Sequence, residues 1–283
     1  MRIVRTIGEM RARAEAARRA GEIVGLVPTM GFFHEGHLSL MRTARAECGT
    51  VVVSLFVNPT QFGPGEDLAA YPRDFERDCA LAAAEGVDAM FVPEAGEMYA
   101  ADHATFVNVE RLTGNLCGAS RPSHFRGVAT VVAKLFHICL PHRAYFGLKD
   151  YQQVRVVETM IRDLNFATEL VRCPIVREPD GVAMSSRNSY LSPEERRAAT
   201  ILRRSLVASG KRVEQGERDG AAIARQLRET IETESLASVD YAEVVDTESL
   251  APLGRIRRAA LLAVAVRIGR ARLIDNLVVE TVA

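Results

Sequence analysis

The sequence has little cysteine, and its cysteines form no pattern. Their number is odd and no CxxC pair occurs, which argues against a disulfide framework and against a zinc knuckle. The interpretation that remains is buried free thiols in a reducing compartment. The five cysteines are Cys48, Cys79, Cys117, Cys139 and Cys173.

Long apolar runs and an excess of charge of one sign are also missing. No run of about 18 apolar residues occurs, so no membrane-spanning helix is expected. Residues 1–21 lack the continuous apolar core of a secretory signal. Lys and Arg total 36, and so do Asp and Glu, a balance that argues against broad binding to nucleic acid or membrane surfaces. We therefore expect a cytoplasmic protein with neither kind of partner.

Three well-known motifs are absent as well. The sequence contains no GxxxxGK[ST] loop, no GxGxxG after its first buried strand and no GxSxG. These absences argue against a P-loop kinase, a dinucleotide-binding enzyme and a hydrolase with a nucleophile elbow.

What the sequence contains is a regular alternation of short β-branched runs with longer amphipathic stretches. Such a succession is typical of an α/β protein with a parallel sheet and crossover helices. Strands are expected at residues 23–27 (stopping at Pro28), 51–57, 87–92, 144–147 and 169–176, and helices at 6–20, 36–47, 73–85, 127–140 and 151–164. In such sheets ligands bind beyond the carboxyl ends of the strands, so residues just after strands are the candidates for chemistry.

The texture changes near residue 178. Two helices are expected after this point, one capped by Ser192 with Pro193 and Glu195, and one at about 217–233. Strand candidates follow at 239–245, 260–268 and 273–279. The sequence therefore predicts domain boundaries of 1–177 and 178–283, the second domain being a smaller α+β domain.

The first candidate site is the segment from Pro28 to His37, which follows a strand and opens a helix. Orphan N–H groups at a helix start favour an anion. His34 and His37 lie three residues apart, near one face of the helix, and can donate hydrogen bonds to nucleotide phosphates. The alternative is that one histidine caps the helix and the other packs.

The second and third candidates are residues 56–62 and 121–127. Gln61 offers an amide that suits a hydroxy acid, although by spacing alone an ordinary Asn-Pro turn with Gln61 on the surface is the better explanation. Arg121 could meet a carboxylate or phosphate, or it could simply be solvated in a helix-entry loop.

The fourth and fifth candidates are residues 146–153 and 183–188. Lys149 can place a positive charge on phosphates, and Asp150 can accept from a ribose hydroxyl or merely cap a helix. In the other segment Ser185, Ser186 and Arg187 form a compact polyphosphate grip, or a polar interdomain linker.

Taken in order, these segments resemble the pantothenate synthetase (pantoate–β-alanine ligase) family of the HxGH nucleotidyltransferase superfamily. The resemblance covers nearly the whole chain. It rests on PTMGFFHEGH, FVNPTQF, YPRDFERD, RPSHFRGVATVV, FGLKDYQQ, REPDGVAMSSRNSYLS and AVAVRIGRARLIDN. It departs at Leu148, where the family often has Glu or Gln, so this chain has no polar side chain at that position.

The resemblance implies a Rossmann-like catalytic domain that binds ATP and pantoate, a C-terminal lid domain, and a homodimer. It also implies a ligase that condenses pantoate with β-alanine through a pantoyl adenylate, using ATP and Mg²⁺ and releasing AMP and pyrophosphate. The alternatives are a nucleotidylyltransferase of the same superfamily and a non-catalytic nucleotide-binding protein.

The resemblance further implies roles for individual residues. The catalytic residues it implies are His37, His34, Lys149 and Arg187. The ATP-binding residues are Met30, His34, His37, Gly147, Lys149, Asp150, Val176, Met184, Ser185, Ser186 and Arg187. The pantoate-binding residues are Met30, Gln61 and Gln153, with Arg121 near the phosphates and Mg²⁺ held mainly by the phosphates of ATP.

Overall fold

The fold was analysed in a computed structural model that describes residues 1–281. The chain divides into two compact units. The first contains Met1–Val109, Arg121–Leu148 and Gln153–Pro174, and the second contains Glu110–Ser120, Lys149–Gln152 and the chain from Ile175 onward. The sequence placed a single boundary at residue 177. The structure changes unit between Pro174 and Ile175 and adds two earlier segments to the second unit.

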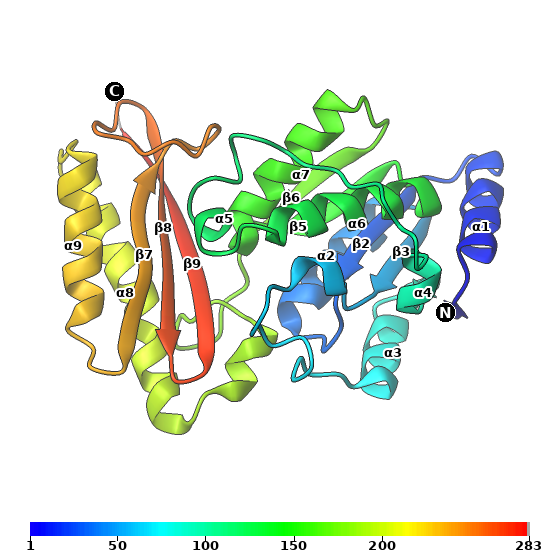
Figure 1. The fold of residues 1–283 in the computed structure, drawn as a ribbon, viewed down its shortest axis with the longest axis horizontal. Coiled ribbons are helices and arrows are strands. Elements are labelled where there is room, and N and C mark those ends of the chain that lie inside the picture. The colour runs from blue at the N-terminus through cyan, green and yellow to red at the C-terminus, as the bar shows by residue number, and fades with distance from the viewer. Residues whose placement is uncertain (282–283) are drawn as a thin grey trace. The chain divides into compact units, whose positions relative to one another are not determined.

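The first unit is built on a six-stranded sheet in which every pairing is parallel (Figure 1). The strand order is β1-β4-β3-β2-β5-β6. Strands β2 and β5 lie next to each other at the centre, with β3 continuing on one side and β6 on the other, so the order reverses at the β2–β5 boundary. Ligands of open α/β sheets bind outside the carboxyl ends at such a switch point. The strands are β1 (Arg2–Val4), β2 (Val24–Thr29), β3 (Thr50–Leu55), β4 (Ala89–Phe91), β5 (Arg143–Gly147) and β6 (Glu169–Cys173).

The expected crossover helices are present, within a few residues of their predicted bounds. Helix α1 packs against α6, and α2 packs against α3. On one face of the sheet Val27, Val51 and Val53 form a core with Met41 of α2, as alternate strand residues do when one face is buried. The helices are α1 (Ile7–Arg19), α2 (Glu35–Glu47), α3 (Phe75–Ala84), α4 (Ala95–Met98), α6 (His124–Cys139) and α7 (Tyr151–Asp163).

Thr6 and Glu9 have the spacing of a capping box at the start of the helix expected at 6–20, but the structure forms only half of that box. The Thr6 hydroxyl accepts the Glu9 N–H at 3.3 Å, as an N-cap does. The Glu9 carboxylate instead binds Arg2, with Nε and Oε1 3.2 Å apart. An ion pair with Arg2 of β1 thus takes the place of the second capping bond, which would join the Glu9 side chain to the Thr6 N–H.

Pro28 does not end its strand, contrary to the prediction. Strand β2 continues through it to Thr29, and Pro28 pairs with Ser54 in the β2–β3 register. The main chain of Val24 binds His142, next to β5. The carbonyls of Ile23 and Thr29 instead accept the N–H groups of Thr50, in β3, and Phe56, just after it. Alternate residues face opposite neighbours, so the missing N–H of Pro28 points to the β5 side. The β2–β5 pairing has already ended at Leu26, and no ladder bond is lost.

Strand β1 was not predicted. It is three residues long and pairs with β4, Arg2 opposite Ala89 and Val4 opposite Phe91. Three residues carry too little periodicity to be recognised as a strand, and this one is specified by a partner far along the chain.

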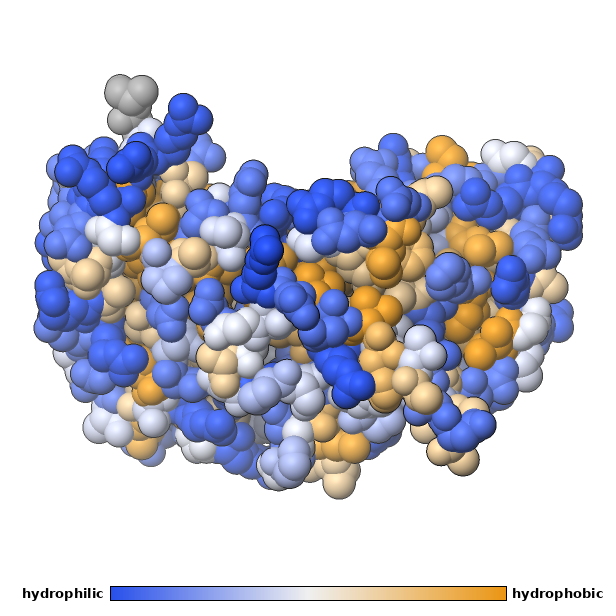
Figure 2. Space-filling model, turned by 45° about the horizontal axis from the view of Figure 1, so that its top comes forward, coloured by the Kyte–Doolittle hydropathy of each residue, from blue (hydrophilic) through white to orange (hydrophobic). Residues whose placement is uncertain are grey.

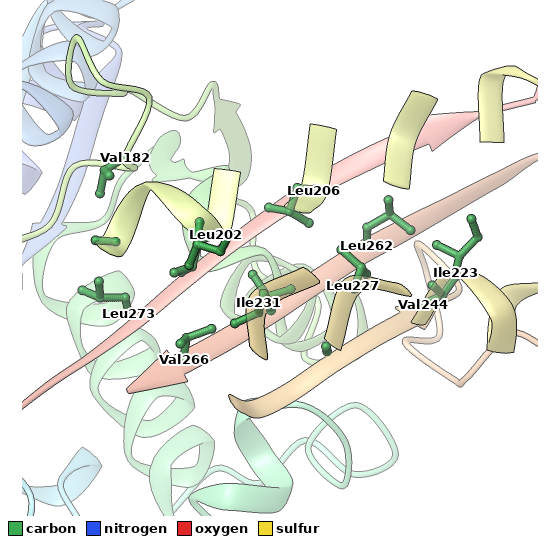
Figure 3. Packing of buried hydrophobic residues seen from close by; sticks show 14 of the residues in the cluster. Val182, Leu202, Leu206, Ile223, Leu227, Ile231, Val244, Leu262, Val266 and Leu273 are labelled. Carbon is green, nitrogen blue, oxygen red and sulfur yellow. The ribbon is translucent and has the colours of Figure 1, made fainter. Parts of the chain in front are cut away.

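The second unit packs two helices on a three-stranded antiparallel sheet, as the α+β pattern predicted. Figure 3 shows Leu202 and Leu206 of α8 and Ile223, Leu227 and Ile231 of α9 directed at the sheet, where they meet residues such as Leu262 and Val266. The elements are α5 (Cys117–Ser120), α8 (Pro193–Glu214), α9 (Gly220–Glu232), β7 (Ala237–Val245), β8 (Ala259–Ile268) and β9 (Ala271–Glu280).

The capping box that opens α8 is confirmed. The Ser192 hydroxyl accepts the Glu195 N–H at 3.2 Å, and the Glu195 carboxylate accepts the Ser192 N–H at 2.8 Å.

The surface is mostly polar, as the share of charged residues in the sequence leads one to expect. The face in Figure 2 is covered mostly by hydrophilic residues, with apolar residues in small separate patches. Within residues 1–281, no helix is both long enough and apolar enough to cross a membrane.

Candidate active site

The loop between β2 and α2 carries the two motif histidines and is held by a buried carboxylate. Gly31 and Phe32 have positive φ values of 88° and 53°, so the chain turns sharply just after β2. Asp78 of α3 accepts the N–H groups of Phe32 at 2.6 Å and Phe33 at 2.7 Å. Burial raises the pKa of the Asp78 carboxyl, and the two N–H bonds offset only part of that effect.

Asp78 was not singled out from the sequence. It lies one helical turn after Asp74, in a segment that reads as an ordinary polar helix start. Only its burial inside the fold shows that it anchors the histidine loop. No local feature distinguishes Asp78 from the other polar residues at the start of α3.

The two histidines are brought together. Their ring centroids are 4.1 Å apart, and the His37 ring also packs against Phe33. His37 Nδ1 accepts the backbone N–H of His34 at 3.3 Å. In a neutral imidazole this places the proton on Nε2, which is then a donor. His34 occupies the N-cap position of α2 and the His37 ring packs against Phe33, as the alternative of one capping and one packing histidine predicted. The same arrangement leaves the Nε2 donor of His37 suited to an anion.

Gln61 lies inside the protein, so the surface-turn alternative is wrong. Its side chain belongs to a short 3₁₀ turn (η1, Pro59–Gln61) after β3, and its Nε2 lies 2.9 Å from the sulfur of Met30. Two residues expected to share a function thus meet across 31 positions of the chain.

Asn58, which sequence reasoning treated as part of a turn, is the hub that orients Gln61. Its amide nitrogen donates to Gln61 Oε1 at 3.2 Å and to the Gly127 carbonyl at 3.1 Å. Its Oδ1 accepts the hydroxyls of Thr60 and Tyr99, both at 2.9 Å. A fully buried amide with this many partners fixes the neighbouring side chain rigidly.

Gly127 allows this approach. A Cβ at this position would lie 2.4 Å from the Thr60 carbonyl oxygen and 2.6 Å from the Gln61 nitrogen. Only a glycine lets α6 come this close to the η1 backbone.

Arg121 meets a carboxylate, but one that belongs to the protein. Its guanidinium grips Glu66 with bonds of 2.7 and 2.6 Å and also reaches the Gln61 carbonyl at 3.3 Å. Burial acts to raise the pKa of Glu66, but the hydrogen bonds and charge of Arg121 outweigh it and lower that pKa. The pair closes one side of the loop that carries Gln61.

In the second unit, Lys149 and Ser185 line the same pocket. Lys149 sits in a single 3₁₀ turn (η2, Leu148–Asp150) directly after β5. With Ser185 and Asp275 it lines a small pocket. The Ser185 hydroxyl caps the next 3₁₀ turn (η3, Ser186–Tyr190) by accepting the Arg187 N–H at 3.3 Å.

The remaining predicted residues are located as follows. Val176 and Met184 are neighbours, because the Met184 N–H donates to the Val176 carbonyl at 3.0 Å. Gly147 ends β5 next to β2 in the sheet, and a Cβ on it would meet nothing within 4 Å. Gln153 lies partly buried in the first turn of α7, and Asp150 is exposed.

The site residues therefore form two groups. The first unit holds Met30, His34, His37, Gln61, Arg121, Gly147 and Gln153, and the second holds Lys149, Asp150, Val176, Met184, Ser185, Ser186 and Arg187. Within each unit, residues from distant segments meet. Met30 meets Gln61 and His34 meets His37 in the first unit, and Lys149 shares a pocket with Ser185 in the second.

A comparison of the sequence with models of known protein families shows which family this chain belongs to. The model described as pantoate-beta-alanine ligase matches residues 2–278, which include every residue of both groups. The chain belongs to the pantoate–β-alanine ligase family. Membership of this family makes it an enzyme of the ligase class.

Curated relatives and solved structures agree with this membership. The chain is 55% identical over 280 residues to the pantothenate synthetase of Heliobacterium modesticaldum, covering 99% of this chain and 100% of that protein. It is 56% identical over 280 residues to that of Roseiflexus castenholzii, with the same coverage of both.

Among solved structures, a pantothenate synthetase from Thermus thermophilus superposes with a TM-score of 0.92 at 50% identity, covering 98% of this chain and 99% of that one. A pantoate-beta-alanine ligase from Francisella tularensis, complexed with beta-gamma ATP and beta-alanine, has a TM-score of 0.80 at 30% identity and covers 98% and 97%. The fold of this ligase is thus the family fold over nearly its full length.

Proposed function

We propose that this chain condenses pantoate with β-alanine at the expense of ATP, giving pantothenate, AMP and pyrophosphate. The observation that carries the proposal is the family match over residues 2–278, which spans both groups of site residues. The Francisella relative, a structure with an ATP compound and β-alanine, supports the choice of substrates.

The reaction would proceed in two steps. A carboxylate oxygen of pantoate attacks the α-phosphorus of ATP, and the bond from that phosphorus to the bridging oxygen breaks, releasing pyrophosphate. The neutral amine of β-alanine then attacks the acyl carbon of the adenylate. AMP leaves with the oxygen that linked it to the acyl group, and the amine gives up a proton. Because the amine must be neutral, activity should favour mildly alkaline pH.

The first unit would supply pantoate binding and part of the charge stabilisation. Gln61, Met30 and Gln153 would hold pantoate, with the Gln61 amide already oriented by Asn58. His37 would donate from Nε2 to the phosphates, and His34 would act beside it. Donors fixed in advance stabilise charge that develops in a transition state.

The second unit would bind the rest of the nucleotide. Lys149 and Arg187 would offset the negative charge on the transferring and leaving phosphates, with Ser185 and Ser186 as hydroxyl donors. Val176 and Met184 would contact the nucleotide together with Gly147, and Asp150 would accept from the ribose. Arg121, with its Glu66 partner, would lie near the phosphates.

Mg²⁺ fits this scheme as an ion carried by ATP. Among the described residues, no cluster of three His, Cys, Asp or Glu side chains is placed to hold a metal. Mg²⁺ is commonly held by substrate phosphates and water with few protein ligands. When bound it would neutralise charge on the phosphate oxygens.

The setting follows from the same membership. We propose a cytoplasmic homodimer whose chain has a catalytic domain and a C-terminal lid domain, with the boundary between Pro174 and Ile175 rather than at residue 177.

Pantoate-dependent release of pyrophosphate from ATP, followed by detection of products, tests the proposal. Pyrophosphate that appears only with pantoate, and free AMP and pantothenate after β-alanine is added, are the expected results. Retention of AMP in the final product would instead indicate a nucleotidylyltransferase. A chain that binds ATP but releases no pyrophosphate would be a binding protein.

A further inference from the structure

Two consecutive polar residues on β9, Asp275 and Asn276, are buried without a role in the scheme above. Their exposed fractions are only 3% and 6%. They belong to the late AVAVRIGRARLIDN segment, which the family resemblance includes but to which it assigns no function. Buried polar side chains destabilise a protein unless they are hydrogen-bonded, so their partners indicate what they do.

Asn276 binds the backbone of the phosphate-directed lysine. Its Nδ2 donates to the Lys149 carbonyl oxygen at 3.0 Å, across 127 positions of the chain. Lys149 lies in a single 3₁₀ turn, a structure with poor internal hydrogen-bond geometry. A bond from a rigid strand fixes the orientation of that turn and with it the direction in which the lysine side chain leaves.

Asp275 holds the segment that leads to Ser185. Its two oxygens accept from Arg177 at 2.7 and 2.9 Å, the bidentate geometry that is strongest between these groups. Arg177 also donates to the Gly181 carbonyl at 3.0 Å and pairs with Ala183 in an antiparallel bridge. The carboxylate thus stabilises the turn immediately before Met184 and Ser185.

The two residues are also tied to each other. Asp275 Oδ1 accepts the backbone N–H of Asn276 at 2.7 Å, and Asp275 lines the pocket that Lys149 and Ser185 share. One rigid strand therefore fixes two separate phosphate-directed segments at adjacent positions.

We propose that Asp275 and Asn276 are positioning residues that hold Lys149 and the Ser185–Arg187 segment in register for the same triphosphate. The proposal rests on the function proposed above, because it takes those two segments as phosphate-binding.

The test compares Asn276→Asp and Asp275→Asn with a matched control, Asp240→Asn. Asp240 is the partner of Arg272 in another largely buried ion pair of the same unit, 2.6 Å long, and contacts neither phosphate-directed segment. We expect each of the first two variants to lower kcat by about 10-fold or more and to raise the KM for ATP. Asp240→Asn should lower Tm and leave both kinetic constants near the wild-type values.

A double-mutant cycle separates positioning from general support. If Asn276 acts through Lys149, Asn276→Asp should add less than about a 2-fold loss to Lys149→Ala, because the effects of coupled residues are not additive. An independent loss of equal size in both backgrounds, wild-type kinetics for Asn276→Asp, or the same kinetic loss in Asp240→Asn would overturn the proposal. If Asn276→Asp does not fold, as judged by circular dichroism, Asn276→Ala removes the same bond without adding a charge.

The same assay keeps this inference apart from the proposed function. A wild-type enzyme without pantoate-dependent pyrophosphate release, or a Lys149→Ala variant as active as wild type, would contradict the proposed function. An active wild type, an impaired Lys149→Ala and an unaffected Asn276→Asp would contradict the positioning role alone.

Discussion

The carboxylate of Asp78 accepts the backbone N–H of Phe33 at 2.7 Å, from a helix that follows the histidine loop by more than 40 residues. With the bond to Phe32, it fixes the path of the chain just before His34 and His37. The precision of the histidine pair therefore depends on a buried acid that acts through the backbone.

Replacing Asp78 by Asn should slow adenylation strongly. The amide can accept one N–H, but its NH₂ group would face the other, so the loop must move. A shift of about 1 Å in a positioning element can lower a rate by about 10²-fold. Pyrophosphate release at saturating substrates measures the effect. Asp74→Asn on the same helix keeps an N-cap acceptor for Arg77 and should behave as wild type; equal rates for the two variants would contradict the anchoring role.

His37→Ala should lower the rate of pyrophosphate release by about 10²-fold or more, because it removes a fixed donor to developing charge. The suitable control is His137→Ala, because His137 is an exposed residue in the last turn of α6 whose ring contacts Phe166. Unchanged pyrophosphate release in His37→Ala would remove this residue from the mechanism.

Gly127→Ala should weaken pantoate binding and destabilise the first unit. The added methyl group would press on the Thr60 carbonyl and the Gln61 nitrogen, and overpacking of this kind costs about 1–3 kcal/mol. Urea unfolding and the KM for pantoate are the measurements. The control is Gly8→Ala, where a methyl group would meet nothing within 4 Å; its stability and its KM for pantoate should be at least as good as those of the wild type. A normal KM for pantoate in Gly127→Ala would show that Gln61 tolerates the shift.

The Arg121–Glu66 pair should make stability depend on acid pH. Because the pKa of Glu66 is lowered in the folded protein, its contribution is complete above the unfolded value of about 4.3 and is lost as pH falls through the folded value. The difference in free energy of unfolding between wild type and Glu66→Gln should thus be constant near neutrality and shrink below about pH 4. A difference that widens as the pH falls would contradict the assignment.

Sequence patterns predicted those features of the structure that depend on interactions between residues close together in the chain. Ser192, Pro193 and Glu195 indicated the start of α8 because a capping box is completed within four residues. The apolar strands, together with the rule that ligands bind at carboxyl ends, were enough to locate the loops that carry His34, Gln61 and Lys149.

What the sequence could not show depends on contacts between distant segments. The second half of the Thr6–Glu9 box was displaced by Arg2, and Pro28 fits inside β2 only because the neighbouring strand has already diverged. Asn58 and Asp78 read as a turn and a polar helix residue, and burial beside backbone donors and acceptors gave them their roles. No spacing rule connects residues that meet only after the sheet has formed.

The assignment of Glu110–Ser120 and Lys149–Gln152 to the second unit has a practical consequence for dissecting this enzyme. A fragment that begins at residue 178 would leave Tyr241 and Arg272 without the thiol of Cys117, and Asn276 without the carbonyl of Lys149. The complete second unit therefore cannot be produced as one continuous C-terminal fragment. A chimera built from two relatives would have to exchange these two short segments together with the C-terminal segment that begins at Ile175.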